Sequence, residues 1–377
     1  MRMRPVVALA AGGTGGHVFP AEAVAACLRT RGIVPILFTD RRGTGFGGAA
    51  EVVRVYGAAI TGMGWFARVT GIGRLAVGFF AALAHLRRTR PDVVIGFGGY
   101  ASVPTVLAAN LIRIPTAVHE QNAVLGRANR LLARRVRRIA TCFQRVSALR
   151  KADEAKVVRL GMPVRPAFAA WTAAAYEAPA TEGEIRLLVL GGSQGAQVFS
   201  TLVPDALSRL DAGLRDRLAV TQQCRPETLA ATRAAYARLG ITAELSSFFA
   251  DVPERLAGAH LVIARAGAST VAELAVVGRP AILVPYPYAT DDHQTANARA
   301  LDAAGAGWLM PQAELTAERL ADRLTALIAD APALLGAASR ACDLGIADAA
   351  ERLADLALEL VFTADGSGAS RGRRAAA

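Results

Sequence analysis

The sequence predicts an α/β protein with two doubly wound, Rossmann-like domains. Short aliphatic segments alternate with longer segments rich in alanine, leucine and arginine, and two aliphatic segments run directly into similar glycine-rich turns. Continuous apolar strands separated by helical segments are typical of parallel sheets that are covered on both faces. A chain of 377 residues, 53% of them hydrophobic, is long enough for two such cores.

The expected strands fall into two groups. They are residues 6–10, 35–39, 92–95, 116–119 and 138–142 in the first half, and 186–190, 218–222, 261–264 and 281–285 in the second. The first strand of each half leads into a glycine-rich turn, GGTGGH at 12–17 and GGSQGA at 191–196. Each turn therefore opens a domain, and we place the boundary at 164/165, inside the GMPVRP segment. Residues 348–360 predict a last amphipathic helix, and 363–377 a polar, disordered tail.

Composition limits the partners and the compartment. The net charge of +12 comes almost entirely from arginine, which suits a nucleic acid, a phosphorylated substrate or an anionic lipid surface. The four cysteines stand far apart, so neither a metal-type pair nor a disulfide framework is expected, and the reducing cytoplasm is the simplest compartment. No segment approaches the roughly 20 apolar residues that span a bilayer, so any membrane contact would be peripheral.

The GGTGGH turn predicts a phosphate-binding loop. Glycines after a strand let the backbone approach a ligand closely, and the following helix offers N–H groups and the positive end of its dipole. His17 closes the turn and is a candidate general base, because imidazole titrates near neutral pH. A plain tight turn and a structural histidine are the alternatives.

The GFGGYA segment at 96–101 allows a different function. It fits the G-x-G-x-x-A pattern of a dinucleotide site, with Glu120 at about the position of a ribose ligand, but it follows an internal strand. HEQN at 119–122 is only half of a zincin motif, and the chain contains no P-loop. Metal-dependent hydrolysis and ATPase activity therefore lack a signature.

The GGSQG segment allows a serine hydrolase. It contains G-x-S-x-G, the pattern of a nucleophile elbow, which would make Ser193 the nucleophile. The candidate partners in the chain order of such a triad are Asp251 or Asp291 and His260 or His293. The alternative is a second phosphate loop, in which Ser193 donates to a phosphate oxygen.

The segment 261–297 carries the richest set of polar side chains. Arg265 and a turn of small residues follow a strand, and the next helix contains Glu273 in its first turns. Amides at such a helix start can hold a diphosphate, while a carboxylate further along can accept from both hydroxyls of a ribose. The next strand ends before DDHQTANA, which adds polar groups at the same carboxyl edge: Asp291, His293, Gln294 and Asn297.

Segment 64–88 combines apolar residues with arginines. Its aromatic residues are Trp65, Phe66, Phe79 and Phe80. An apolar face fringed by arginine suits insertion at an anionic lipid interface. The alternative is a core-packing helix with a solvated basic face, and no nucleic-acid-binding motif is present.

Seven motifs occur in order across nearly the whole chain: GGTGGHVFP, GFGGYAS, HEQN, GMPVR, GGSQGA, ARAGASTVAEL and DDHQTANA. Together they resemble the MurG family, the peripheral-membrane N-acetylglucosaminyltransferases of peptidoglycan synthesis. The resemblance implies a bacterial protein with the GT-B fold, in which two Rossmann-like domains face each other across a cleft. Residues 1–164 would face the acceptor and the membrane, residues 165–344 would bind the donor, and a helix over 345–362 would return to the first domain.

The implied reaction transfers GlcNAc from UDP-GlcNAc to the C4 hydroxyl of MurNAc in undecaprenyl-diphosphoryl-MurNAc-pentapeptide (lipid I), giving lipid II. Transfer would invert the anomeric centre and need no metal or other cofactor. The implied partners are UDP-GlcNAc, lipid I, the anionic cytoplasmic face of the cell membrane and other proteins of cell-wall synthesis, which supports cell shape and division; no nucleic acid is implied. Another GT-B glycolipid synthase, a UDP-GlcNAc 2-epimerase and the serine hydrolase stay open as alternatives.

The resemblance also implies a donor site. The backbone of Phe249 would read uracil, Glu273 the ribose hydroxyls, and Gln294 with Asn122 the GlcNAc hydroxyls. The other members of the implied donor set would lie near the diphosphate: Thr14, Gly15, Gly16, Arg165, Ser193, Arg265, Ser269 and Thr270. This chain departs from the family pattern at His293, where glutamine is common.

On the acceptor side, the resemblance implies a diphosphate-binding loop made of Gly12, Gly13, Thr14, Gly15 and Gly16. His17 would take the proton of the acceptor hydroxyl. The membrane-docking surface would include Trp65, Phe66, Phe79 and Phe80.

Overall fold

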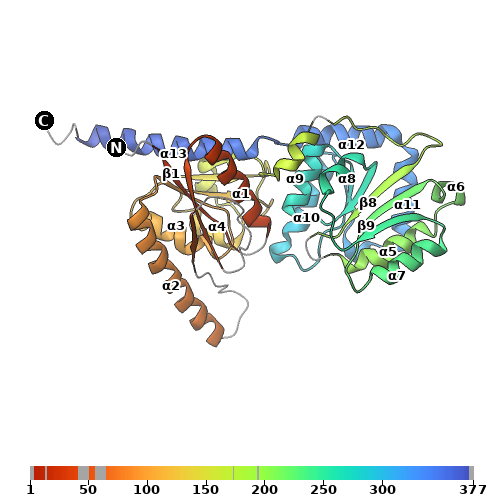
Figure 1. Ribbon diagram of the computed structural model, residues 1–377, viewed down its shortest axis with the longest axis horizontal. Coiled ribbons are helices and arrows are strands. Elements are labelled where there is room, and N and C mark those ends of the chain that lie inside the picture. The colour runs from red at the N-terminus through yellow and green to blue at the C-terminus, as the bar shows by residue number, and fades with distance from the viewer. Residues whose placement is uncertain are drawn as a thin grey trace. The chain divides into compact units, whose positions relative to one another are not determined.

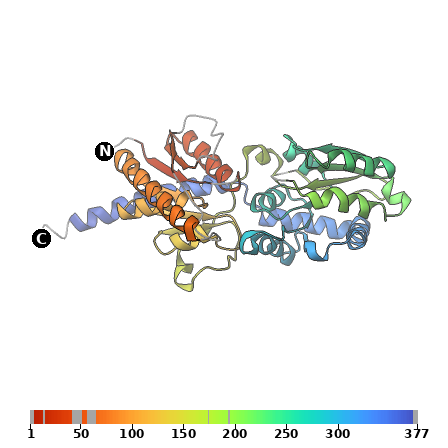
Figure 2. The same ribbon diagram turned by 90° about the horizontal axis from the view of Figure 1, so that it is seen from below.

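The computed structural model describes residues 4–12, 15–40, 51–55, 65–172, 174–192 and 195–372, and at 15, 65–72 and 364–372 it describes the backbone only. The chain divides into two compact units, Met1–Arg165 with Ala347–Ala377, and Pro166–Ile346. Figures 1 and 2 show that each unit has its own twisted sheet flanked by helices. The boundaries that the sequence suggests, 164/165 and 344/345, lie close to this division.

The first unit is a parallel sheet covered by helices on both faces. Within the described residues the sheet has seven strands in the order β3-β2-β1-β4-β5-β6-β7, all parallel. The strands are β1 (Val6–Ala10), β2 (Val34–Thr39), β3 (Glu51–Arg54), β4 (Val93–Gly96), β5 (Thr116–Glu120), β6 (Arg138–Thr141) and β7 (Val157–Arg159). The helices are α1 (Gly15–Thr30), α2 (Trp65–Thr89), α3 (Ser102–Leu111), α4 (Arg127–Leu132), α13 (Ala349–Gly372) and the short 3₁₀ helix η1 (Lys151–Lys156).

Burial on both faces explains the continuous apolar strands. In β1, Val7 and Leu9 join the core cluster with α1 and α13, whereas Val6, Ala8 and Ala10 join the cluster with α2, α3 and α4. Successive side chains of a strand point to opposite faces, so a strand between two helical layers needs apolar residues at every position.

The second unit repeats this architecture. For the part of the chain that the structure describes, its sheet has six parallel strands in the order β10-β9-β8-β11-β12-β13. The strands are β8 (Ile185–Leu190), β9 (Leu218–Gln223), β10 (Thr242–Ser246), β11 (Leu261–Ala264), β12 (Ala281–Leu283) and β13 (Trp308–Leu309). The helices are α5 (Gln197–Leu207), α6 (Ala212–Arg215), α7 (Leu229–Arg238), α8 (Val252–Gly258), α9 (Ala268–Val277), α10 (His293–Ala303), α11 (Ala317–Ala329) and α12 (Ala331–Leu344), with 3₁₀ turns η2 (Pro166–Trp171), η3 (Thr290–Asp292) and η4 (Gln312–Glu314).

The two sheets share one winding order. In each, the first strand lies inside the sheet, the next two strands extend to one side of it, and the fourth strand returns to its other side. This is the doubly wound order of the Rossmann fold, and the prediction of two such domains is confirmed. The strands that the sequence did not predict are the edge strands β3, β7, β10 and β13. An edge strand has a neighbour on one side only and needs no continuous apolar run.

The last helix belongs to the first unit. Leu353 and Leu360 of α13 are buried in the core cluster that contains α1, and Asp355 forms an ion pair with Arg31 at the end of α1. The helix continues to Gly372, so its backbone extends into the polar segment that the sequence predicts to be a disordered tail from residue 363 on. Residues 373–377 lie outside the described part of the chain.

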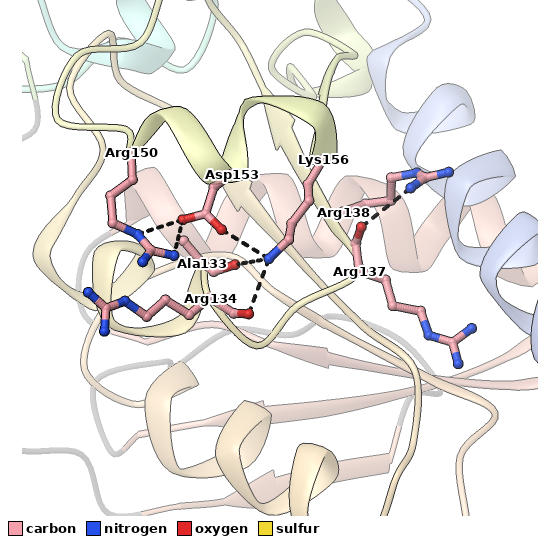
Figure 3. A network of polar contacts seen from close by, with 7 residues as sticks. All are labelled: Ala133, Arg134, Arg137, Arg138, Arg150, Asp153 and Lys156. Carbon is pink, nitrogen blue, oxygen red and sulfur yellow. Dashed lines mark hydrogen bonds and ion pairs between the residues drawn. The ribbon is translucent and has the colours of Figure 1, made fainter.

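A buried aspartate fixes the segment before β7 (Figure 3). Asp153 is 2% exposed and accepts hydrogen bonds from Arg150 Nε at 2.8 Å and Lys156 Nζ at 3.0 Å. The same ammonium donates to the carbonyls of Ala133 and Arg134, just after α4 ends, at 2.9 and 3.1 Å. Cations suit the carboxyl end of a helix, and a buried carboxylate needs such partners. The network therefore ties η1 to the end of α4.

Candidate active site

In the first unit, two glycine loops meet at the carboxyl edge of the sheet. β1 and β4 are neighbours in the sheet, and the strands that follow them lie on opposite sides: β2 beyond β1, and β5 beyond β4. The Phe97 N–H donates to the Ala10 carbonyl at 2.8 Å. A Cβ on Gly12 would lie 2.3 Å from the Ala101 Cβ, and a Cβ on Gly99 would lie 2.2 Å from the Gly12 oxygen. Gly99 of the 96–101 motif thus serves close packing against the first loop. Doubly wound sheets bind ligands at this switch point.

His17 lies in the first turn of α1 at this edge. Its ring packs on Gly98, where a Cβ would lie 3.2 Å from both His17 Cε1 and Nδ1. The His17 Nδ1 is 3.1 Å from the Gln121 Oε1, and Gln121 follows β5 directly. A half-buried imidazole held at the carboxyl edge is suited to general-base chemistry.

Glu120 organises the HEQN segment from inside. It is 2% exposed, and its carboxylate accepts from the N–H groups of Asn122 at 3.0 Å and Gly126 at 2.8 Å, and from Asn129 Nδ2 at 2.8 Å. The Asn122 amide itself donates to Glu120 at 3.4 Å. The carboxylate thus shapes the loop that carries Asn122, and the structure gives it no position as a ribose or metal ligand.

In the second unit, the switch point lies between β8 and β11. The loop after β8 is tight, because a Cβ on Gly191 would lie 2.2 Å from the Ala196 nitrogen, and Gly195 has a φ of +65°. After β11, α9 begins directly after its N-cap residue Gly267, and no side chain of the described residues caps this N-terminus. The first N–H groups of α9, including those of Ser269 and Thr270, have no partner inside the helix and suit an anion.

Arg265 acts on the protein itself. It is 9% exposed, its Nη1 donates to the carbonyls of Val284 and Pro285 at 3.1 and 3.0 Å, and its Nη2 donates to Gln312 Oε1 at 2.7 Å. Burial lowers the pKa of this guanidinium. Arg265 therefore holds the chain that follows β12, and a contact of its side chain with phosphate stays a prediction.

The DDHQTANA segment contains one buried side chain, Asn297, and two half-buried ones, His293 and Gln294. Asn297 is fully buried and donates to the Ala266 carbonyl at 3.0 Å, so it holds the turn before α9. Gln294 Oε1 accepts from the Tyr286 N–H at 2.9 Å, which fixes the amide group. His293 Nδ1 donates to the Thr290 carbonyl at 2.7 Å. The sequence predicts these residues as one group, and the fold shows that Asn297 stabilises the turn before α9. Gln294 remains the predicted contact to the ligand.

Phe249 and Glu273 lie at or near the same edge of the second sheet. Phe249 follows β10, its ring is 6% exposed, and the Arg255 guanidinium carbon lies 4.3 Å from the ring centroid. Arg255 in turn pairs with Glu244 and Asp251. Glu273 is half-buried in the middle of α9. The backbone of Phe249 is thus held by a buried ring, as a backbone contact to a base requires.

The histidine of one hydrolase alternative lies at the wrong edge. His260 precedes β11, and its Nδ1 accepts from the N–H of Arg186 at the start of β8, over 3.1 Å. It therefore sits at the amino edge, whereas Ser193 follows the carboxyl end of β8. A strand of this length spans roughly 20 Å, so His260 lies far from the carboxyl end of β8 at Leu190, the end that Ser193 follows in sequence. Burial, reinforced by Arg186 and Arg279, lowers the pKa of His260 to about 4.

The α2 helix exposes an apolar stripe next to arginines. Val77 is 57% exposed and Phe80 is 66% exposed, whereas Phe79 packs against the core cluster of this unit. Phe79 is half-buried and therefore exposes less of its ring than Phe80 does. Arg74 and the arginines of the last turn are exposed. Among the helices of the described ranges, none is long and apolar enough to cross a membrane.

Several predicted site residues cannot be placed in this geometry. Gly13, Thr14 and Ser193 lie outside the described residues, as do the side chains of Trp65 and Phe66. Arg165 is the last residue of the first unit before the chain enters the second, and Gly15 and Gly16 begin α1. In the part of the chain that is described, no group of three or more His, Cys, Asp or Glu side chains could hold a metal ion.

Two doubly wound units, each with a glycine loop and a helix start at its switch point, are the architecture of the GT-B fold. The glycosyltransferase family 28 N-terminal domain matches residues 7–141, and the family 28 C-terminal domain matches residues 186–353. A relative from Rhodospirillum rubrum, named UDP-N-acetylglucosamine--N-acetylmuramyl-(pentapeptide) pyrophosphoryl-undecaprenol N-acetylglucosamine transferase, is 57% identical over 93% of this chain and 90% of its own length. A relative of the same name from Paramagnetospirillum magneticum is 55% identical over 97% of this chain and 99% of its own.

A solved structure agrees with these relatives. The crystal structure of Acinetobacter baumannii MurG superimposes with a TM-score of 0.78 at 30% identity, over 94% of this chain and 99% of that one. The chain belongs to the MurG family. It is an N-acetylglucosaminyltransferase of peptidoglycan synthesis.

Proposed function

We propose that this chain transfers GlcNAc from UDP-GlcNAc to the C4 hydroxyl of MurNAc in undecaprenyl-diphosphoryl-MurNAc-pentapeptide, converting lipid I to lipid II. The observation that carries the proposal is the 57% identity, over 93% of the chain, to a relative named for this transfer. The two family 28 domains support the same reaction class.

The proposed donor site uses the carboxyl edge of the second sheet. The diphosphate would meet the N–H groups at the start of α9, near Ser269 and Thr270, where no described side chain competes. Glu273 would accept from the ribose hydroxyls, and the Gln294 amide would donate to the sugar, because its oxygen already accepts from Tyr286. The rest of the proposed donor set is Thr14, Gly15, Gly16, Asn122, Arg165, Ser193, Arg265 and the backbone of Phe249.

The proposed chemistry is a single displacement. The acceptor C4 oxygen attacks the anomeric carbon, the bond from that carbon to the β-phosphate oxygen breaks, and the hydroxyl proton passes to His17. UDP leaves with a growing negative charge, which helix amides and the diphosphate-binding residues can stabilise without a metal ion. The loop from Gly12 to Gly16 would hold the acceptor diphosphate beside His17.

We further propose that α2 docks on the membrane at its cytoplasmic face. The polyprenyl tail of the acceptor stays in the bilayer, so the enzyme must work at the bilayer surface. Val77 and Phe80 offer exposed apolar contact, and Arg74 with the two arginines of the last turn offers attraction to anionic lipids. Trp65 and Phe66 would extend this surface.

The proposal is tested by transfer of radiolabelled GlcNAc from UDP-GlcNAc to a short-chain lipid I analogue, with and without EDTA. We expect product in both conditions. Product that disappears with EDTA would overturn the metal-free mechanism. No product despite tight UDP-GlcNAc binding would overturn the proposed acceptor and favour epimerase chemistry or another acceptor.

A further inference from the structure

A buried chain of hydrogen bonds ends at the ring of His17. The His17 Nδ1 lies 3.1 Å from Gln121 Oε1, while Gln121 Nε2 lies 2.7 Å from the Phe97 oxygen and 3.2 Å from His119 Nδ1. At the far end, His119 Nε2 lies 2.9 Å from the Gly161 oxygen. Gln121 is 2% exposed and His119 is fully buried. Buried polar groups of this kind must satisfy one another, so each proton in the chain can be assigned.

The assignment begins at the far end. The Gly161 carbonyl can only accept, so the Nε2 of His119 carries a proton and donates it. Burial lowers the pKa of His119 to about 4, which keeps the ring neutral at physiological pH. A neutral imidazole has one N–H and one lone pair. The Nδ1 of His119 is therefore an acceptor and faces the Gln121 amide.

The same reasoning fixes the orientation of Gln121. The Phe97 carbonyl also can only accept, and a flipped amide would bring two oxygen atoms within 2.7 Å of each other. The two N–H groups of Gln121 are thus directed at Phe97 and His119. Its oxygen is left facing His17, where it accepts from Nδ1.

We propose that Gln121 is a positioning residue that imposes the Nδ1–H tautomer on His17 and so places the ring's lone pair on Nε2. The proposal rests on the proposed role of His17 as the base. A base must present a lone pair, and the hydrogen bond at one imidazole nitrogen decides where that lone pair lies. After His17 takes up a proton at Nε2, the Nδ1–H still donates to the same oxygen, so the ring keeps its orientation throughout.

The titratable groups beside this chain leave the assignment intact. Cys142 Sγ lies 3.5 Å from His119 Nε2, and burial raises the pKa of this thiol well above its usual value, so it brings no negative charge. The Glu120 carboxylate is turned to the N–H of Gly126 and the amide of Asn129. Gln121 itself is neutral and orients the ring without adding charge.

The first test is the tautomer of His17 in the full chain. The chain has five histidines, and ¹⁵N-histidine labelling reports whether each ring nitrogen carries a proton. The signals of His17 are those missing from the His17→Ala spectrum. At a pH where the ring is neutral, we expect a protonated Nδ1 and an unprotonated Nε2. A proton on Nε2 of neutral His17 would overturn the proposal, and this measurement requires neither activity nor a folded Gln121 variant.

The second test separates positioning from folding. Gln121→Leu should give a mixture of His17 tautomers and lower kcat about tenfold, a part of the 10²- to 10⁴-fold that a general base supplies. The KM for UDP-GlcNAc should stay close to normal. In the His17→Ala background the same substitution should change kcat no further. An equal loss in both backgrounds, or an unchanged kcat after the tautomers redistribute, would overturn the proposal.

A matched substitution controls for lost stability. Gln222 is also fully buried, and its Oε1 accepts from the Tyr236 hydroxyl at 2.5 Å in the second unit. Gln222→Leu should lower the melting temperature and leave the His17 signals unchanged; a shifted tautomer there would count against a specific role for Gln121. If the unmodified chain forms no lipid II, the proposed function fails, while the spectrum still decides the tautomer.

Discussion

Glu273 is the residue whose proposed contact is easiest to isolate. A carboxylate that accepts from both ribose hydroxyls contributes to donor binding throughout the reaction, so Glu273→Ala should raise the KM for UDP-GlcNAc about 10- to 100-fold and change kcat less. Initial rates with UDP-GlcNAc and with its 2′-deoxyribose analogue measure this. The variant should lose the preference for the ribose donor. A preference equal to that of the unmodified chain would place the ribose elsewhere.

At the residue scale, motif spacing predicts which segments lie at the site. It is a poorer guide to the contacts that each side chain makes there. The resemblance gives HEQN a role only through Asn122, yet Gln121 and Glu120 organise the edge where His17 lies. Gln121 could not be found from the sequence, because its partners Phe97 and His17 stand 24 and 104 positions earlier. Arg265 was predicted to meet phosphate, and only the fold reveals the carbonyls after β12 that it binds.

At the scale of elements, the loop after β4 sets the position of the α1 histidine. Gly98 has a φ of +86°, and a Cβ there would press on the His17 ring from 3.2 Å. Gly98→Ala should therefore destabilise the fold by about 1–2 kcal/mol and also lower kcat about tenfold or more, because a base displaced by a fraction of an ångström is poorly aligned. Thermal unfolding and steady-state kinetics measure the two effects.

Gly32 provides the matched control for this loop. It has a φ of +72°, and no heavy atom lies within 4 Å of the position that a Cβ would take, so Gly32→Ala introduces the same backbone strain without touching the site. We expect a similar loss of stability and a normal kcat. Equal kinetic defects in the two variants would show that general destabilisation, and not displacement of His17, causes the loss.

The exposed stripe of α2 should control binding to anionic vesicles. Replacing Val77 and Phe80 by serine removes the two large apolar side chains of the stripe, and we expect sedimentation with such vesicles to weaken about tenfold or more. Transfer to a short-chain acceptor should stay close to normal. Leu335→Ser, at a 45% exposed position on α12, should leave vesicle binding unchanged. Unaltered sedimentation of the α2 variant would remove this helix from the proposed docking surface.

The more completely a strand is buried, the more accurately its bounds could be predicted from the sequence. The central strands were predicted nearly to their ends because helices cover both of their faces. The β3 and β10 strands have mostly exposed or half-buried positions, so their sequences lack a continuous apolar run. The final helix was predicted from its amphipathic pattern, but its continuation to Gly372 through a glycine- and serine-containing segment was not.

At the scale of the whole molecule, one winding order serves both units. Each unit places its glycine loop and helix start at the carboxyl edge of its sheet. In contrast, the ion pair of Asp153 lies before β7, and the hydrogen bond between His260 and the Arg186 N–H lies at the start of β8 and β11. The carboxyl edges thus remain available for ligand chemistry, and the amino edges contribute to stability. Changes at an amino edge should therefore affect folding without affecting transfer.

The pH dependence of unfolding offers a test of this division, since each unit contains a buried neutral histidine. His119 and His260 both have pKa values lowered to about 4, chiefly by burial. A histidine in the unfolded chain has a pKa of about 6.5, so on acidification the unfolded state takes up the proton first. The stabilisation is complete above about pH 6.5 and is lost as the pH falls towards 4, because the unfolded state binds more protons in this range. His260→Asn keeps an acceptor for the Arg186 N–H and cannot titrate, so denaturant unfolding of this variant between pH 7 and 4.5 should show a flatter loss of stability. Its transfer activity at neutral pH should be normal. A slope equal to that of the unmodified chain would mean that His260 takes up no extra proton on unfolding, and lost activity would mean that the amino edge is not separate from the site.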